Sequence, residues 1–142
     1  MNKETTRLGV YGWLSSGKRG IEGYLFLLHR ITGIALLAFL CLHVFVSSFR
    51  LFGEQAWAWA MAMTHSALIE LLEYAVFVAF VFHAFNGVRL IAIELGFVVG
   101  QPAEPVFPYK GSIAKQRPLT ITIMVLAGAF IVMGGLELLR LT

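Results

Sequence analysis

Residues 24–49 read YLFLLHRITGIALLAFLCLHVFVSSF, an apolar run that is interrupted by two histidines and one arginine. A helix needs about 20 mostly apolar residues to cross the hydrocarbon core of a bilayer, which is roughly 30 Å thick. Two later stretches meet the same requirement, at about residues 68–99 and 119–139. The sequence therefore predicts an all-α integral membrane protein with three transmembrane helices, in a single domain that covers residues 1–142.

Composition separates this chain from soluble domains. Of its 142 residues, 58% are hydrophobic and only 13% are charged, whereas a soluble domain carries charge on about a quarter of its residues. Residues 1–23 are polar and lack the short apolar core of a cleavable signal peptide, so we expect the first helix to be retained. The single cysteine, Cys41, lies inside that helix, which excludes an internal disulfide and a thiolate metal cluster.

Basic residues gather in two polar segments, residues 1–23 and residues 101–118. Cytoplasmic segments of membrane proteins carry an excess of lysine and arginine, so both segments are expected on the cytoplasmic (or matrix) side. We therefore expect a multi-pass protein of the cell inner membrane, with its N-terminus in the cytoplasm and its C-terminus outside. The basic segments contain no groove with interleaved aromatic residues, so nucleic acid is not an expected partner.

The two connections between the spans differ in character. Residues 101–118 carry all four prolines, and we expect this cytoplasmic connection to be irregular because proline cannot continue a helix. The outer connection, near residues 50–67, contains Trp57 and Trp59. Tryptophans at that level are typical of a helix at the membrane interface, and we favour this interpretation over a substrate site.

The pattern His-x-x-x-Gly occurs twice, at residues 29–33 and at residues 83–87. In a helix this spacing puts the glycine one turn from the histidine on the same face. The missing side chain leaves space for a flat group beside the imidazole, or for another helix to come close. The pattern alone leaves both alternatives open.

Histidines inside a bilayer are costly and usually face the interior of a bundle, where they have a function. Neutral imidazole is also a common axial ligand of haem iron. His83 lies about ten residues, hence about 15 Å, from the cytoplasmic end of the second span. Its residue type and depth fit haem ligation, and they fit equally well a hydrogen bond to a carbonyl or hydroxyl of a neighbouring helix.

His43 follows His29 by 14 residues, which places it on the same helix face and about 21 Å further along the axis. It would then lie roughly 10 Å further out than His83. Two axial ligands of one haem lie at similar depth, so each of these histidines would need a partner from another chain. The alternative for His43 is a hydrogen bond to Ser47 one turn on.

His29 and Arg30 stand at the cytoplasmic mouth of the first helix. A His-Arg pair there can bind haem propionates or polarise a quinone carbonyl, while the alternative for Arg30 is to reach lipid phosphate. Arg89 invites the same two interpretations, and His65 in the outer connection has no assigned role. The sequence contains no phosphate loop, no pair of catalytic carboxylates and no Ser-His-Asp set, so this chain is not expected to oxidise a soluble substrate unaided.

Two motifs carry a resemblance to a known family. LHRITG at residues 28–33 resembles the family signature His-Arg-x-[Ser/Thr/Gly]-Gly, and FHAFNGVR at residues 82–89 resembles His-x-x-x-Gly-x-Arg. In this order and about 50 residues apart, they make the chain similar to the cytochrome b membrane anchor of succinate dehydrogenase, an enzyme also known as succinate:quinone oxidoreductase. The resemblance extends from Tyr24 to Gly96, about half of the chain.

The resemblance implies roles for individual residues. His83 matches the axial ligand of haem b, and Arg30 matches the arginine that lines the quinone pocket and approaches a haem propionate, with His29 beside it. His43 matches the helix-one ligand of members that bind two haems. Phe26 stands where some members have a serine that contacts quinone, and Leu90 stands where a histidine often follows the second motif.

The resemblance also implies cofactors and partners. One haem b, or two shared with a partner subunit, would be held in a bundle with a second three-helix anchor subunit. An iron–sulfur subunit and a flavoprotein subunit would dock on the cytoplasmic face and pass electrons from succinate to a quinone such as menaquinone. Two alternatives are a haem-free structural anchor and a small ion- or proton-conducting assembly that uses His83, Arg89 and Glu94 as a relay.

Overall fold

The computed structural model describes residues 20–97 and 113–141, and within these ranges it contains helices and no strand. Three of the helices are long and apolar enough to cross a membrane, which confirms the predicted all-α, three-span architecture. They are α2 (Ile21–Ser47), α4 (Ala67–Glu94) and α5 (Ile113–Leu141). Two short helices join the first two spans, namely η2 (Ser48–Phe52) and α3 (Glu54–Thr64). The orientation of the chain across the membrane stays a prediction.

Glycines set the limits of the first span. Gly20 precedes α2 with φ of 89°, and Gly53 follows η2 with φ of 98°. Glycine adopts such positive φ values without the steric cost that a Cβ atom brings. Together, α2 and η2 form a continuous helical segment, Ile21–Phe52, which is longer at both ends than the predicted 24–49. The chain then turns sharply at Gly53 into α3. The guanidinium of Arg50 lies 4.1 Å from the centre of the Trp57 ring across this turn.

The second span ends earlier than the predicted residue 99. Ser66 caps its start by accepting a hydrogen bond from the backbone of Ile69. At the other end, Gly96 has φ of 79°, and its N–H bonds to the carbonyl of Ile93 while that of Phe97 bonds to the carbonyl of Ala92. This pair of bonds is the Schellman motif, which closes a helix on a glycine. Residues 98–112 lie outside the described residues.

The third span begins earlier than the predicted residue 119. Helix α5 already includes Ile113, and Pro118 lies inside it. Proline fixes φ near the helical value and removes one backbone donor. Because Pro118 is close to the start of the helix, a single hydrogen bond in its second turn is lost and the helix continues. The predicted irregular connection thus excludes residues 113–118, and its remainder lies outside the described residues.

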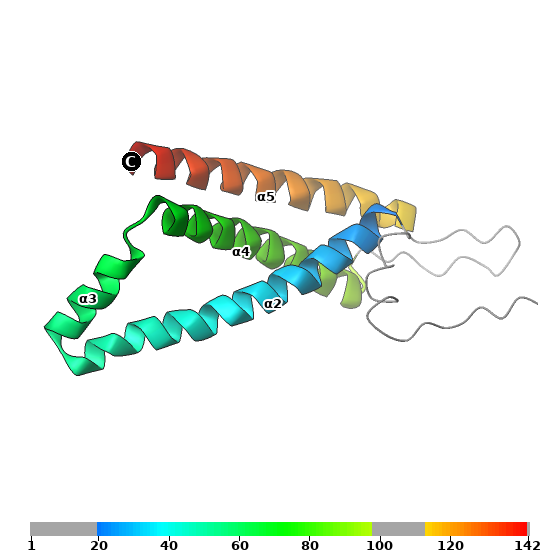
Figure 1. Cartoon of the computed structure of the whole chain (residues 1–142). Helices are drawn as coiled ribbons and strands as arrows, with labels where there is room; N and C mark the ends of the chain where they lie inside the picture. The colour runs from blue at the N-terminus through cyan, green and yellow to red at the C-terminus, as the bar shows by residue number, and fades with distance from the viewer. Residues whose placement is uncertain (1–19, 98–112, 142) are drawn as a thin grey trace, which may run out of the picture.

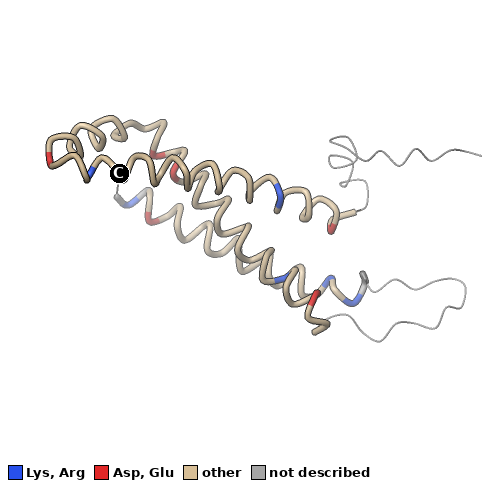
Figure 2. The backbone as a smooth tube through the Cα atoms, turned by 90° about the horizontal axis from the view of Figure 1, so that it is seen from below, with Lys and Arg blue, Asp and Glu red and all other residues tan. Residues whose placement is uncertain are grey.

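Helix α4 is the central element. Figure 1 shows that α2 crosses α4 near the start of α2 and the end of α4, that the two helices diverge from there, and that α3 bridges them at the far end, while α5 runs beside α4. Charged residues of the described part gather toward the two ends of the helices and leave the middle apolar (Figure 2). Few apolar side chains are buried within the chain, so most of the apolar surface of the spans faces outward.

Close contact between α4 and α5 depends on two glycines. Gly134 and Gly135 lie against the rings of Phe77 and Tyr74, so closely that a side chain at either glycine would collide with a ring. The hydroxyl of Tyr74 donates a hydrogen bond of 3.0 Å to the carbonyl of Ile131. These contacts join α4 to α5 far from the α2–α4 crossing. They help to hold α4, the helix that carries His83, Asn86 and Arg89, in place.

Candidate functional site

The two His-x-x-x-Gly motifs meet where α2 and α4 cross. A Cβ atom on Gly33 would lie 3.0 Å from Cε1 of His83, and one on Gly87 would lie 3.5 Å from Cε1 of His29. Each glycine therefore makes room for the histidine of the other motif. Of the two alternatives for the space beside the glycine, the structure shows a close helix approach in which an imidazole fills the space.

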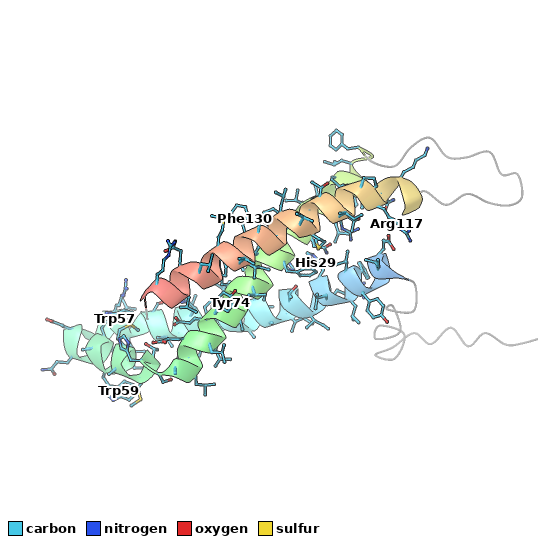
Figure 3. The ribbon with its side chains drawn as sticks, turned by 90° about the horizontal axis from the view of Figure 1, so that it is seen from above. His29, Trp57, Trp59, Tyr74, Arg117 and Phe130 are labelled. Atoms are coloured by element: carbon cyan, nitrogen blue, oxygen red, sulfur yellow. The ribbon has the colours of Figure 1, made fainter. Side chains whose placement is uncertain are left out.

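The two imidazoles stack face to face. The ring centroids of His29 and His83 are 3.9 Å apart, and the ring planes differ by 9°. His29 points from α2 into the space between the helices (Figure 3). We refer to these two side chains as the histidine stack.

The hydrogen bonds of His83 define its tautomer. Its Nδ1 lies 3.1 Å from the carbonyl oxygen of His29 and 3.2 Å from Oγ1 of Thr32. A carbonyl oxygen only accepts, so Nδ1 carries the proton and donates. The Thr32 hydroxyl donates in turn to a backbone carbonyl, that of Leu28 at 2.9 Å or that of His29 at 3.0 Å. In the neutral ring the lone pair is then on Nε2.

The histidine stack leaves two nitrogens without protein partners. Nε2 of His83 makes no hydrogen bond within the described ranges, and it is not sealed inside the chain. Nδ1 of His29 is buried and has no partner among the described residues. Buried polar atoms normally find a partner. The histidine stack thus combines one fixed, open imidazole nitrogen with one unsatisfied nitrogen.

Three buried polar side chains, linked by hydrogen bonds, lie one turn beyond the histidine stack. They are Asn86, Arg89 and Thr120, and we refer to them as the polar junction. Asn86 is fully buried; its Nδ2 donates to the carbonyl of Leu25 at 3.4 Å, and its Oδ1 accepts from Nε of Arg89 at 2.9 Å. Nη1 of Arg89 donates to Oγ1 of Thr120 at 3.4 Å, and Thr120 donates to the carbonyl of Gln116. The polar junction therefore ties α2, α4 and α5 together.

Two other predicted site residues face outward. Arg30 is exposed, and its guanidinium lies 4.2 Å from the centre of the Phe26 ring. His43 is exposed as well, with its ring centroid 5.7 Å from that of Phe39. No hydrogen bond between His43 and Ser47 occurs in the described structure. The structure brings together His29 and His83 and leaves Arg30 and His43 on the outer surface of α2.

Sequence reasoning missed Thr32, Asn86 and Thr120, which complete the site. Asn86 lies three residues before Arg89, a spacing at which side chains of a helix are neighbours, and a polar pair inside an apolar span was a usable signal. Thr32 and Thr120 gave no such signal because threonine is common in membrane helices. Within residues 20–97 and 113–141, no three His, Cys, Asp or Glu side chains gather around a point that would hold a bare metal ion.

The fold and the site define a class of protein, namely a small helical membrane protein that stacks two half-buried histidines where two of its spans cross. The family model for the succinate dehydrogenase/fumarate reductase transmembrane subunit matches residues 10–136. The match covers most of the chain, and the chain therefore belongs to this family of membrane subunits, as the sequence resemblance predicted.

Two curated relatives agree with this assignment. The succinate dehydrogenase hydrophobic membrane anchor subunit of Halobacterium salinarum is 36% identical over 69 residues, which cover 48% of this chain and 53% of the relative. The succinate dehydrogenase 2 membrane subunit SdhC of Mycobacterium tuberculosis is 33% identical over 66 residues, which cover 46% of this chain and 48% of the relative. The matches thus span about half the length of each relative.

Proposed function

We propose that this chain is the haem b-binding anchor of a succinate:quinone oxidoreductase, with Nε2 of His83 as an axial ligand of the iron. The observation that carries the proposal is the hydrogen bond from Nδ1 of His83 to the carbonyl of His29. A haem-ligating histidine typically donates its other ring N–H to a carbonyl, which fixes the ring and increases its basicity as a ligand. Haem b would supply one-electron transfer between its ferric and ferrous states.

The residues around His83 hold it ready for ligation. Thr32 is buried beside Nδ1, His29 covers one face of the ring, and Gly33 lets the ring lie against the backbone of α2. These contacts leave the ring little freedom to rotate and direct its open nitrogen away from the bonded edge. The unsatisfied Nδ1 of His29 is a further polar group that a propionate or a bound water would satisfy.

Arg30 is the proposed contact for the quinone. Its guanidinium is exposed, and it rests on the ring of Phe26. Stacking on an aromatic face leaves the N–H groups in the guanidinium plane free to donate. A charged donor of this kind would hold and polarise a quinone carbonyl. Phe26, which replaces a serine of some family members, would then form an apolar wall of the pocket.

The proposed complex contains further subunits. A single histidine from this chain gives an iron one axial ligand, so a second anchor subunit would supply the other, and His43 would serve a second haem in the same way. The outward apolar surface of the three spans offers room for such a subunit beside lipid. Iron–sulfur and flavoprotein subunits would dock on the cytoplasmic side of the inner membrane and would carry the succinate-oxidising site.

The proposal is tested with the His83→Ala variant, expressed and purified with its partner subunits. We expect the haem b band of the reduced-minus-oxidised spectrum to be lost or strongly reduced in His83→Ala. His65→Ala is the matched control, because His65 is an exposed histidine outside the spans, and it should keep the full band. A full band in both variants would show that His83 is not the ligand.

A haem-free structural anchor is the second candidate, and the same contacts favour it. The bond from His83 to the His29 carbonyl and the histidine stack also join α2 to α4 without any cofactor. A colourless, intact wild-type complex would select this candidate. A proton relay of His83, Arg89 and Glu94 gains no support from the described contacts, because the bonds of Arg89 lead to Asn86 and Thr120.

A further inference from the structure

Arg89 is a buried cation that is held by uncharged acceptors. Only 2% of its surface is exposed, and its described hydrogen bonds go to the amide oxygen of Asn86 and the hydroxyl of Thr120. The ion pairs of the described residues are Glu22–Arg117 and Glu137–Arg140, and neither includes Arg89. The carboxylate whose charge acts on Arg89 is Glu22, on α2, and it lies within salt-bridge distance of Arg117 instead.

A buried charge without an adjacent counter-charge creates a strong local field. Guanidinium keeps its charge in proteins, and removal from water is costly unless a nearby anion or hydrogen bonds compensate. The polar junction supplies the hydrogen bonds but no negative charge. The positive potential of Arg89 therefore extends into its surroundings, which include the histidine stack one turn away on the same helix crossing.

We infer that Arg89 is a positioning residue that tunes the redox centre from a distance: it ties α4 to α5 through the polar junction, and its charge favours the reduced state of the haem that His83 would hold. This inference rests on the proposed function of His83. It differs from direct contact with a propionate or a quinone, because the guanidinium is enclosed by Asn86 and Thr120. Reduction adds one electron to the centre, so a nearby fixed cation stabilises the reduced state relative to the oxidised state.

The expected size of the effect follows from the spacing along α4. Arg89 is six residues from His83, which corresponds to about 9 Å along the helix axis. At an effective dielectric constant of about 20, one unit charge at about that distance changes an equilibrium constant by roughly ten- to twentyfold. Loss of the charge should therefore raise the ferric-to-ferrous ratio about ten- to twentyfold at a fixed ambient potential.

The test compares three variants of the assembled complex by potentiometric titration of the haem band. Arg89→Gln removes the charge and keeps an amide donor, so the ratio should shift about ten- to twentyfold toward ferric haem. Arg89→Lys keeps the charge, so its ferric-to-ferrous ratio should stay within about twofold of the wild-type ratio. Arg140→Gln removes an equal charge from an exposed arginine in the last turn of α5, and the ratio should be unchanged.

Three outcomes would overturn the inference: an unchanged ratio in Arg89→Gln, equal shifts in Arg89→Gln and Arg89→Lys, or an equal shift in Arg140→Gln. If the complex that contains Arg89→Gln does not assemble, the Glu22→Gln variant tests the electrostatic effect of Arg89 instead. Removing this carboxylate should strengthen the field of Arg89 and shift the ratio toward ferrous haem, and an absent shift would contradict us. A wild-type complex without haem would refute the proposed function itself, whereas haem with an insensitive potential would refute only the role of Arg89.

Discussion

Replacement of Gly33 by alanine should disrupt the α2–α4 crossing. The new Cβ atom would lie 3.0 Å from Cε1 of His83, whereas ordinary contacts begin near 3.4 Å. The imidazole must then move by a few tenths of an ångström. Its Nδ1 bonds, now 3.1 Å and 3.2 Å long, would lengthen toward the limit at which they cease to be hydrogen bonds. Overpacking of this kind costs about 1–3 kcal/mol, and loss of the Nδ1 bond adds about 1 kcal/mol.

Two other glycines of the chain provide a graded control. Gly87→Ala places its Cβ 3.5 Å from His29, an ordinary contact, and Gly128→Ala meets no atom within 4 Å. Replacing glycine by alanine in a helix increases the intrinsic helix propensity by up to about 1 kcal/mol. At Gly33 the clash with His83 opposes this gain, whereas at Gly87 and Gly128 no clash opposes it. The thermal midpoint of the detergent-solubilised complex and its haem content per chain should therefore fall in Gly33→Ala, change little in Gly87→Ala, and hold or rise in Gly128→Ala. Equal behaviour of all three variants would refute the described crossing.

Three further predictions concern single side chains. His43→Ala should lower the haem content per chain of a two-haem complex by half, and an unchanged content in quantitative haem assays would exclude His43 as a ligand. Thr32→Val removes the hydroxyl beside Nδ1 of His83 at nearly constant volume, so we expect retained haem with a shifted midpoint potential, measured by redox titration; an identical potential would show that the hydroxyl is irrelevant to the site. Asn86→Leu leaves Nε of Arg89 without its acceptor and should destabilise the complex by about 1–3 kcal/mol, read as a lower thermal midpoint, while an unchanged midpoint would show that Asn86 does not support the junction.

The spans were predictable because apolar runs of this length have one physical solution in a bilayer, a helix that satisfies its own backbone. Their ends were less predictable, since they depend on local conformations. Gly96 closes α4 through a positive φ that a hydropathy pattern does not reveal, and Pro118 lies so close to the start of α5 that the helix tolerates it.

The site was predictable in part for a related reason. Periodicity within one helix showed that His83 and Gly87 share a face, and the family motifs assigned roles to both histidine segments. Periodicity did not show that His29 would stack on His83, because the register and crossing angle of two helices depend on contacts between them. Nor did it show that Arg89 faces Thr120, whose position follows from how α5 returns beside α4.

The reciprocal arrangement of the two motifs has one consequence for how a cofactor would bind. His83 is held by the carbonyl of His29, by Thr32 and by the stacked ring, all of which belong to this chain. A ligand that meets a prepared side chain does not need to offset the cost of ordering it, so affinity and geometry both improve. The same bonds also join α2 to α4, which couples ligand geometry to helix packing. A change that loosens the crossing should therefore weaken haem retention even when His83 itself is untouched, and Gly33 is the position where these two effects can be measured together.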